Sequence, residues 1–256
     1  MAYFDVLNFV LSPLLKMPPL LAVIVISLII SLIVILITKY TTNQELMKTL
    51  KEEINEQQKQ IKELKNNPAK AMEVQKKAME ANMKYMSHSL KPTLITLLPI
   101  ILIFGWMNAN FAHEGIAPQQ EFNVYAIFDK AANGEADIIV PEGLEIIGDK
   151  KVNLAPAAIN KKNFDRAAMW TLKGQEGEHI IEILYNDEKQ QKSVLIDNAK
   201  YIEPSRNYNG MVRNVQIEYK PKKILNIFGW KIGWLGTYII FSILFTSVLR
   251  KFMKVY

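Results

Sequence analysis

Three long apolar runs dominate the pattern of hydrophobic and polar positions along the chain. They cover Leu20–Thr38, Pro92–Ala112 and Ile232–Leu249, and none of them contains a charged side chain. Each run has 18 to 21 residues, enough for a helix to cross a hydrocarbon core about 30 Å thick. The pattern predicts an integral membrane protein with three transmembrane helices.

The middle run carries a proline, Pro99, near its centre. A proline inside a helix removes one backbone donor and frees the carbonyl four residues earlier, here that of Ile95. In a membrane a neighbouring hydroxyl can satisfy such a group, and Thr96 is one turn away. We therefore interpret this run as a membrane span rather than as a buried helix of a soluble core.

The segment between the first two runs, residues 39–91, is charged and has helical periodicity. Asn67 and Pro68 have the residue types of an N-cap and a first helical position, so Lys65–Pro68 is predicted to be a turn between two helical arms. Apolar residues recur at spacings of three and four along the first arm, as in a coiled coil with one polar member. This seam consists of Met47, Leu50, Ile54, Gln57, Ile61 and Leu64.

The second arm has two apolar faces. A small-residue stripe suits close packing on the first arm, and a methionine stripe lies on another face. Flexible, polarizable methionine suits surfaces that bind varied hydrophobic partners, although packing on lipid or on a third helix is an open alternative. The small-residue stripe is Ala71, Val74, Ala78, Ala81 and Tyr85, and the methionine stripe is Met72, Met79, Met83 and Met86.

Hydroxyl groups recur at helical spacing in all three apolar runs. They fall on one face of each helix and gather toward one half of the membrane. Such residues often serve as contacts between helices, but together they also fit a hydrated groove. The groove candidates are Ser27, Ser31, Thr38, Lys39, Thr93, Thr96, Tyr238, Ser242, Thr246 and Arg250.

Residues 113–230 have a different character. Short β-branched and aromatic runs, such as Phe122–Phe128 and His179–Tyr185, alternate with turn residues such as Asn133-Gly134 and Asn209-Gly210. This density of short strands predicts an all-β sandwich, and the pattern around Trp170 is similar to strands of an immunoglobulin-like sandwich.

Charge places these parts on two sides of the membrane. Residues 39–91 hold 11 lysines against 7 glutamates, whereas residues 113–230 hold 15 basic against 17 acidic residues. Because cytoplasmic flanks are enriched in lysine and arginine, we expect the hairpin and the C-terminus inside, and the N-terminus and the β-rich domain outside a plasma membrane. The lysines before the third span (Lys220, Lys222, Lys223 and Lys231) count against this orientation.

The predicted organisation has seven segments. Residues 1–19 form an N-terminal segment that is either an interfacial helix or a disordered leader. The others are a first span (20–38), a cytoplasmic hairpin (39–91), a second span (92–112), an extracytoplasmic β-rich domain (113–230), a third span (231–250) and a cytoplasmic tail (251–256).

Sequence motifs for covalent chemistry are missing. The chain has no cysteine, its three histidines lack metal-ligand spacing, and it has no phosphate-binding glycine loop. The three spans also lack the carboxylates of a proton relay. We expect neither an enzyme nor a bound metal or cofactor.

Several motifs resemble a known family. The order of one span, a charged hairpin, a proline-centred span and a last span ending in Arg250 resembles the archaeal YidC-like insertases of the Oxa superfamily. The second span is also similar to the core insertase subunit of the ER membrane protein complex. The residues that carry this second similarity are Pro99, Gly105, Trp106 and Asn108.

This resemblance implies a membrane protein insertase that works without nucleotide hydrolysis. The hairpin would capture hydrophobic client segments, and a hydrophilic groove in a thinned bilayer would pass them into the membrane. The implied partners are nascent membrane proteins, the lipid bilayer, the ribosome, the signal recognition pathway and a Sec translocon, with no role for DNA. Bacterial relatives place an arginine inside the groove, where this first span has none; Lys39 and Arg250 are the nearest cations.

Two other functions compete with insertion. A channel or transporter subunit could line a pore with the same hydroxyl stripes, although no charged filter is visible. A membrane-anchored structural protein could display the β-rich domain and dimerise through the hairpin.

Overall fold

The computed structural model describes residues 2–64, 67–159 and 162–255. The chain divides into two compact units. The helical unit comprises Met1–Trp106 and Ile224–Tyr256, and the β unit comprises Met107–Lys223. Lys65 and Asn66 of the predicted turn lie outside the described residues.

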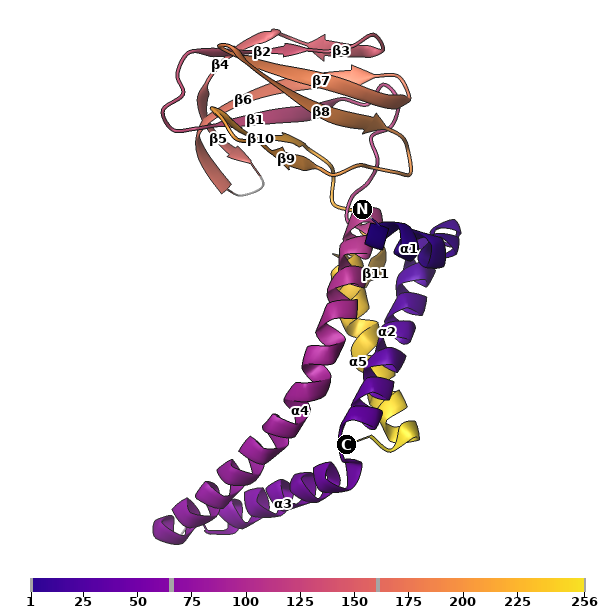
Figure 1. Cartoon of the computed structure of the whole chain (residues 1–256), viewed down its shortest axis with the longest axis vertical. Coiled ribbons are helices and arrows are strands. Elements are labelled where there is room, and N and C mark those ends of the chain that lie inside the picture. The colour runs from indigo at the N-terminus through magenta and orange to yellow at the C-terminus, as the bar shows by residue number, and fades with distance from the viewer. Residues whose placement is uncertain (1, 65–66, 160–161, 256) are drawn as a thin grey trace. The chain divides into compact units, whose positions relative to one another are not determined.

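Five α-helices and one 3₁₀-helix account for nearly all of the helical unit (Figure 1). A two-stranded hairpin, β11–β12, precedes the last helix. The elements are α1 (Ala2–Leu11), η1 (Ser12–Lys16), α2 (Pro19–Thr41), α3 (Gln44–Glu63), α4 (Pro68–Phe111), β11 (Leu225–Ile227), β12 (Trp230–Ile232) and α5 (Trp234–Met253).

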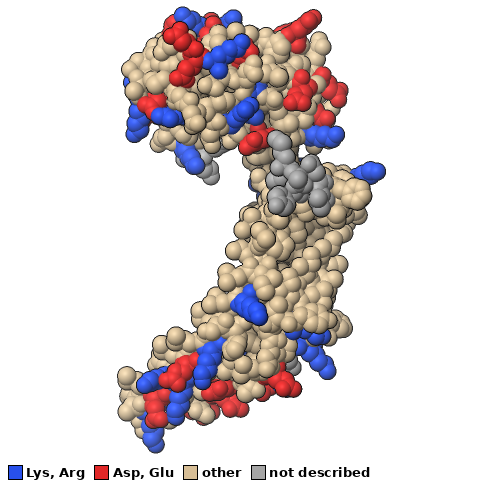
Figure 2. Space-filling model, viewed as in Figure 1, with Lys and Arg blue, Asp and Glu red and all other residues tan. Residues whose placement is uncertain are grey.

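Three of these helices are long and apolar enough to cross a membrane: α2, the apolar part of α4, and α5. This confirms the three predicted spans. Figure 2 shows the same pattern, because the spans form a largely uncharged band and the charged side chains of the helical unit gather at the hairpin. The second span is not a separate helix, since α4 continues from the hairpin arm through Pro92 and Pro99 to Phe111.

The proline in the second span is accommodated differently from the prediction. The Thr96 hydroxyl donates to the carbonyl of Thr93 at 3.0 Å. Because a hydroxyl has one proton to donate, Thr96 does not satisfy the carbonyl of Ile95, and that prediction is wrong. The backbone of Thr93, three residues earlier, is the competing acceptor.

The helical hairpin has the caps and the packing that its sequence indicates. Asn43 begins α3 by accepting from the backbone N–H groups of Glu45 and Leu46, each at 3.1 Å, and Asn67 caps α4 by accepting from Lys70 N–H at 3.2 Å. Leu50 packs with Ala81 in one buried cluster. On the predicted seam Met47, Leu50, Ile54 and Gln57 are buried, and on the small-residue stripe Ala78 and Ala81 are buried.

The β unit is a two-sheet antiparallel sandwich, as its sequence predicts. One sheet has the order β3-β6-β1-β10-β9 with β5 beside β6, and the other has the order β4-β2-β7-β8. The strands are β1 (Phe122–Phe128), β2 (Glu135–Ile139), β3 (Leu144–Ile147), β4 (Lys151–Asn153), β5 (Ala155–Ile159), β6 (Lys162–Gly174), β7 (Gly177–Tyr185), β8 (Glu188–Ile196), β9 (Ser205–Asn207) and β10 (Val212–Ile217).

Alternate residues of both sheets meet in one core that includes Trp170, Leu172, Ile183 and Val194. Inward and outward residues alternate along β7 and β8, as expected for strands with one face on a core. The long β6 strand pairs with β1, β3 and β5 and so organises its sheet.

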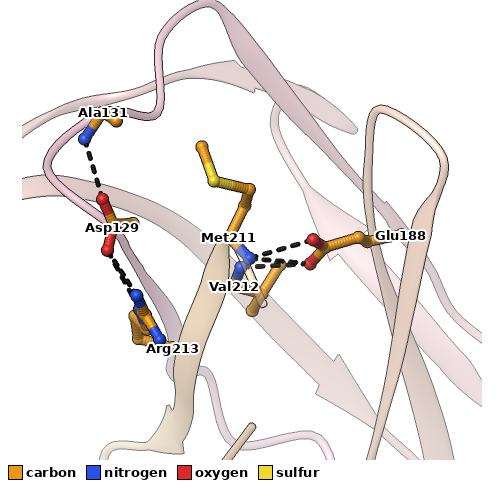
Figure 3. A network of polar contacts seen from close by, with 6 residues as sticks. All are labelled: Asp129, Ala131, Glu188, Met211, Val212 and Arg213. Carbon is orange, nitrogen blue, oxygen red and sulfur yellow. Dashed lines mark hydrogen bonds and ion pairs between the residues drawn. The ribbon is translucent and has the colours of Figure 1, made fainter. Parts of the chain in front are cut away.

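Two carboxylates fix the start of β10 (Figure 3). Glu188 accepts from the backbone N–H groups of Met211 and Val212 at 2.9–3.3 Å. Asp129 accepts from Arg213 at 2.6 and 3.1 Å and from Ala131 N–H at 3.0 Å. These bonds hold the pKa of the Asp129 carboxyl below its usual range.

The last residues of α4, from Met107 on, belong to the β unit and are capped within it. The Tyr201 hydroxyl donates a short hydrogen bond to the carbonyl of Asn108 and accepts from Ala112 N–H at 3.0 Å. The ring of Tyr201 lies edge-on to that of His113, whose pKa is lowered by burial. Burial also raises the pKa of the neighbouring Tyr219 to about 12.

Candidate functional site

Helices α2 and α5 form the closest helical pair in the membrane part of the unit. Ser27 is fully buried and donates to the carbonyl of Val23 at 2.7 Å. Ser31 is 2 % exposed and lies 3.4 Å from the hydroxyl of Thr246 on α5. This part of the hydroxyl stripe is therefore a packed contact between two helices.

Helix α4 joins the other helices through aromatic contacts near its C-terminal end. The ring of Phe104 meets Tyr238 and Trp234 of α5 edge-on, at centroid distances of 4.8 and 5.7 Å. Trp106 is fully buried and donates from Nε1 to Asn8 of α1 at 2.7 Å. Four residues carry the family similarity of the second span. Trp106 and the carbonyl of Asn108 make the hydrogen bonds described above, and Pro99 and Gly105 lie partly buried on the same helix.

Toward the hairpin the three spans enclose a cavity of about 110 Å³. Residues of all three spans line it, together with Met47 and Tyr85 of the hairpin. The polar and proline residues of its wall are Thr38 of α2, Thr42 at the C-cap of α2, Ser89, Pro92, Thr93 and Thr96 of α4, and Arg250 of α5.

The Thr38 and Thr93 hydroxyls in this cavity keep the capacity to accept a hydrogen bond. Thr38 donates to the carbonyl of Val34, and Thr93 donates to that of Ser89, each at 2.8 Å. A threonine hydroxyl that donates its proton to a backbone carbonyl of its own helix still has oxygen lone pairs that can accept from another donor. The wall can therefore accept from the backbone N–H groups of an extended guest segment.

The cavity also contains a cation, Arg250. Its guanidinium Nε is buried and has no hydrogen-bond partner among the described residues. A buried donor without a partner costs free energy unless an acceptor or water reaches it. The site therefore combines hydroxyl acceptors with one fixed positive donor.

A second hollow of about 330 Å³ opens beside α5. It is lined by Ser242, Ile243, Thr246, Ser247 and Arg250. Arg250 thus borders both hollows, one enclosed by the spans and one on the open face of α5.

The ten groove candidates do not share one surface. Thr38, Thr93, Thr96 and Arg250 line the inner cavity, while Ser242, Thr246 and Arg250 line the outer hollow. Ser27 and Ser31 lie in the packed contact between α2 and α5, and Tyr238 packs on Phe104. Lys39 is exposed and lines neither hollow.

Sequence reasoning missed several wall residues of the inner cavity. Thr42 follows Thr38 by four residues, and Ser89 precedes Thr93 by four. Both lie just outside the apolar runs, so extending the four-residue spacing beyond the spans would have found them. No simple sequence signal marks Met47 or Tyr85 as cavity residues.

The four residues of the methionine stripe are all exposed on α4. Their exposed fractions are between 59 and 71 %, while the small-residue stripe packs on α3. The stripe therefore takes no part in closing the hairpin. The described residues include no cluster of three or more His, Cys, Asp or Glu side chains that could hold a metal ion.

A family model described as "Integral membrane protein EMC3/TMCO1-like" matches residues 6–129. Over this stretch the chain is similar to EMC3/TMCO1-like integral membrane proteins. The match covers just under half of the chain: α2, α3, α4 and β1, but neither α5 with Arg250 nor most of the β unit. Searches of curated proteins and of solved structures return no match.

The three candidate spans place the chain in the membrane. The EMC3/TMCO1-like family has a general role in membrane protein biogenesis. Its general partners are membrane protein clients and the lipid bilayer.

Proposed function

We propose that this protein is an insertase of the Oxa superfamily that moves short polar segments of client proteins into the bilayer without nucleotide hydrolysis. The observation that carries the proposal is the inner cavity, where hydroxyl oxygens and the unpartnered Arg250 Nε meet at the hairpin ends of three spans. Polar groups in a membrane are costly unless they meet water, protein or a polar guest.

The mechanism begins at the hairpin. The exposed methionine stripe offers a flexible apolar surface for a client's hydrophobic segment. Met47 and Tyr85 connect the hairpin to the inner cavity, so a captured client lies beside the polar wall. There, hydroxyl oxygens accept from client N–H groups, and Arg250 donates to carbonyl or carboxylate oxygens.

The cavity lowers the barrier because it replaces part of the water that a polar segment loses on entering lipid. The client's own apolar segment then supplies the driving force as it moves sideways into the hydrocarbon core. Arg250 also lines the outer hollow beside α5, which faces lipid in this scheme. This hollow is the exit.

The proposed orientation follows the distribution of lysine. The hairpin, with its excess of lysine, and the end of α5 with Arg250 and Lys251 face the cytoplasm. The inner cavity then opens to the side from which ribosomes, and with them the signal recognition pathway and a Sec translocon, would deliver clients. In an archaeal cell this membrane would be the plasma membrane.

The central test removes hydroxyls without changing side-chain volume. Thr38→Val and Thr93→Val together delete two acceptors from the cavity wall, each worth about 1 kcal/mol. Insertion of a single-span test client into liposomes containing the purified protein should therefore slow by about 10- to 30-fold.

The matched control is Thr41→Val. Thr41 lies on the same helix and donates to its own backbone in the same way, at 2.6 Å to Ile37, but does not line the cavity. Equal insertion rates for the double variant and the control would show that the cavity hydroxyls do not assist insertion. Ion flux through protein-containing liposomes without client would instead favour a channel.

Crosslinking tests the route. A photoreactive residue at Thr93 or Met83 should trap a ribosome-bound client, whereas one at exposed Lys51 on the far arm should not. Equal trapping at all three positions would mean that contact is not specific to the cavity and the methionine stripe. Serine-to-leucine substitutions in the first span are unsuitable as a test, because leucine at Ser27 or Ser31 would overpack the α2–α5 contact.

A further inference from the structure

The β11–β12 hairpin of the helical unit has an unusual turn. Ile227 pairs with Trp230 across it, and the two turn residues are Phe228 and Gly229. Both have positive φ angles, 49° for Phe228 and 89° for Gly229. A left-handed conformation is uncommon for a bulky residue, so the turn displays an aromatic side chain where glycine or asparagine is the usual choice.

A second two-residue turn in the same chain shows the usual choice. Between β7 and β8 the turn is Asn186-Asp187, and Asn186 has the same left-handed conformation, with φ of 50°. That turn is polar. The β11–β12 turn replaces the polar side chain with Phe228, which is fully exposed at 107 % of its reference area.

The flanking side chains extend this apolar surface. Trp230 is 73 % exposed and Ile227 is 36 % exposed, and as a directly opposed pair they lie on the same face of the hairpin. Lys231, the next residue, is exposed. The hairpin tip is thus two aromatic rings and an aliphatic side chain next to a lysine.

The position of the hairpin in the chain identifies what covers this surface. Only Gly233 separates β12 from Trp234, the first residue of α5. At about 3.3 Å per residue the three-residue strand is about 10 Å long. The hairpin tip therefore lies within little more than that distance of the start of α5. Tryptophan and lysine at the end of a span are the residues that sit among lipid headgroups.

We propose that the tip of β11–β12, formed by Ile227, Phe228 and Trp230, is an interfacial anchor that inserts into the headgroup–acyl boundary of the bilayer next to the start of α5. The occupant of this surface is lipid. Phe228 and Trp230 enter the acyl boundary, and Lys231 remains among the phosphates.

The anchor has a consequence for Arg250, which rests on the function proposed above. From Trp234 to Leu249 α5 has 16 apolar or uncharged residues, about 24 Å of helix, whereas a hydrocarbon core is about 30 Å thick. With its first turn fixed at one interface, α5 is too short to carry Arg250 out through the other. The anchor therefore keeps the guanidinium below the opposite headgroups.

The chain contains no cysteine, so a single nitroxide label can be placed at any chosen position. The full-length protein in lipid nanodiscs would carry the label at Phe228→Cys, at Ile243→Cys in the middle of α5, or at Asn186→Cys. Asn186 is the matched control, because it has the same turn position and conformation. Accessibility to oxygen and to a water-soluble nickel chelate is measured at each site.

The label at position 228 should be at least about fivefold less accessible to nickel than the label at 186, with oxygen accessibility between those at 186 and 243. Nickel accessibility equal to that at 186 would place the tip in water and overturn the proposal. Protection from both reagents would mean that protein covers the tip, which also overturns it.

The depth-setting role has its own test. Combining Phe228→Ser and Trp230→Ser with a label at Ser247→Cys should raise nickel accessibility at position 247 by about twofold, as α5 becomes free to slide. An unchanged value would refute this role. Neither readout uses a client, so failure here is distinguishable from failure of the insertase proposal.

Discussion

Replacing the methionine stripe by glutamine separates client binding from hairpin folding. Glutamine has nearly the length and the helix propensity of methionine, so Met72, Met79, Met83 and Met86→Gln should leave α4 helical. Each of these side chains is exposed and makes no contribution to the buried face of the hairpin. We therefore expect a selective loss of affinity for apolar segments.

The magnitude follows from the exposed area. Full burial of a methionine side chain stabilises by about 1.5–3 kcal/mol. Since 59–71 % of each side chain is exposed, covering one adds about 1–2 kcal/mol, less about 0.5–1 kcal/mol for ordering it. Four residues then contribute about 2–4 kcal/mol, which corresponds to a loss of about 30- to 700-fold in affinity.

The assay uses the full-length protein in nanodiscs and a fluorescent peptide containing one transmembrane segment. Its dissociation constant is measured by anisotropy, and helicity is measured by circular dichroism at 222 nm. The four-leucine variant is the matched control, because it keeps the apolar area, and its affinity should stay within about threefold of the parent chain.

Two results would refute this reasoning. Unchanged affinity in the glutamine variant would show that clients do not use the stripe. Parallel losses of helicity and affinity would show that the methionines pack within the protein or on another helix, which is the alternative that the sequence left open.

Three further predictions concern the β unit. Ile183→Ala removes a fully buried core side chain and should lower the free energy of unfolding by about 2–5 kcal/mol in urea titrations. Gly210→Ala places a Cβ 2.6 Å from a Glu188 carboxylate oxygen, and loss of the bonds to Met211 should cost about 1–3 kcal/mol; full stability would contradict Figure 3. Burial lowers the pKa of His113, so the folded unit binds protons less readily than the unfolded chain. Its stability should therefore fall as the pH falls below about 6.5, and His113→Gln should abolish that dependence in pH-dependent thermal unfolding.

The sequence predicted those elements whose pattern depends only on local periodicity. The apolar runs marked the spans because no charge interrupts them. In the hairpin, the three-four spacing identified Leu50 and Ile54 as buried, and the small residues Ala78 and Ala81 as their partners. Phe122–Phe128 was predicted with the exact bounds of β1 because turn residues flank an unbroken apolar run.

Elements fixed by tertiary pairing were less visible. The apolar run Met169–Leu172 lies in the second half of β6, which starts at Lys162. Its first half is polar and alternating because one face of it is exposed beside β5, so a search for apolar runs does not detect it. The three-residue strands β4, β9, β11 and β12 are too short for any period to be recognised. The bounds of the seven segments given under Sequence analysis stay predictions.

The candidate site was predicted in part, for a reason that lies in helix packing. Spacing identifies which residues share a helical face but not what that face meets. On α2, Ser31 meets α5 in a buried contact, while Thr38, two turns further, meets a cavity. The difference arises from α4, which contacts α5 through Phe104 at one end and leaves the cavity at the other.

Under the proposed function, this division lets one hydroxyl stripe serve both helix packing and client insertion. A polar residue in a membrane needs a partner. Ser27 donates to the backbone of its own helix, and Ser31 accepts from Thr246 across the α2–α5 contact. The fixed pair can then hold Thr38 and Arg250 against the cavity, where α4 supplies no partner for the guanidinium Nε. Because the surrounding helices hold this unpaired donor in place, a polar client segment can bind it and leave again, and none of the described residues competes for it. In the proposed mechanism the packed serines support the groove, and the threonines and Arg250 contact the client.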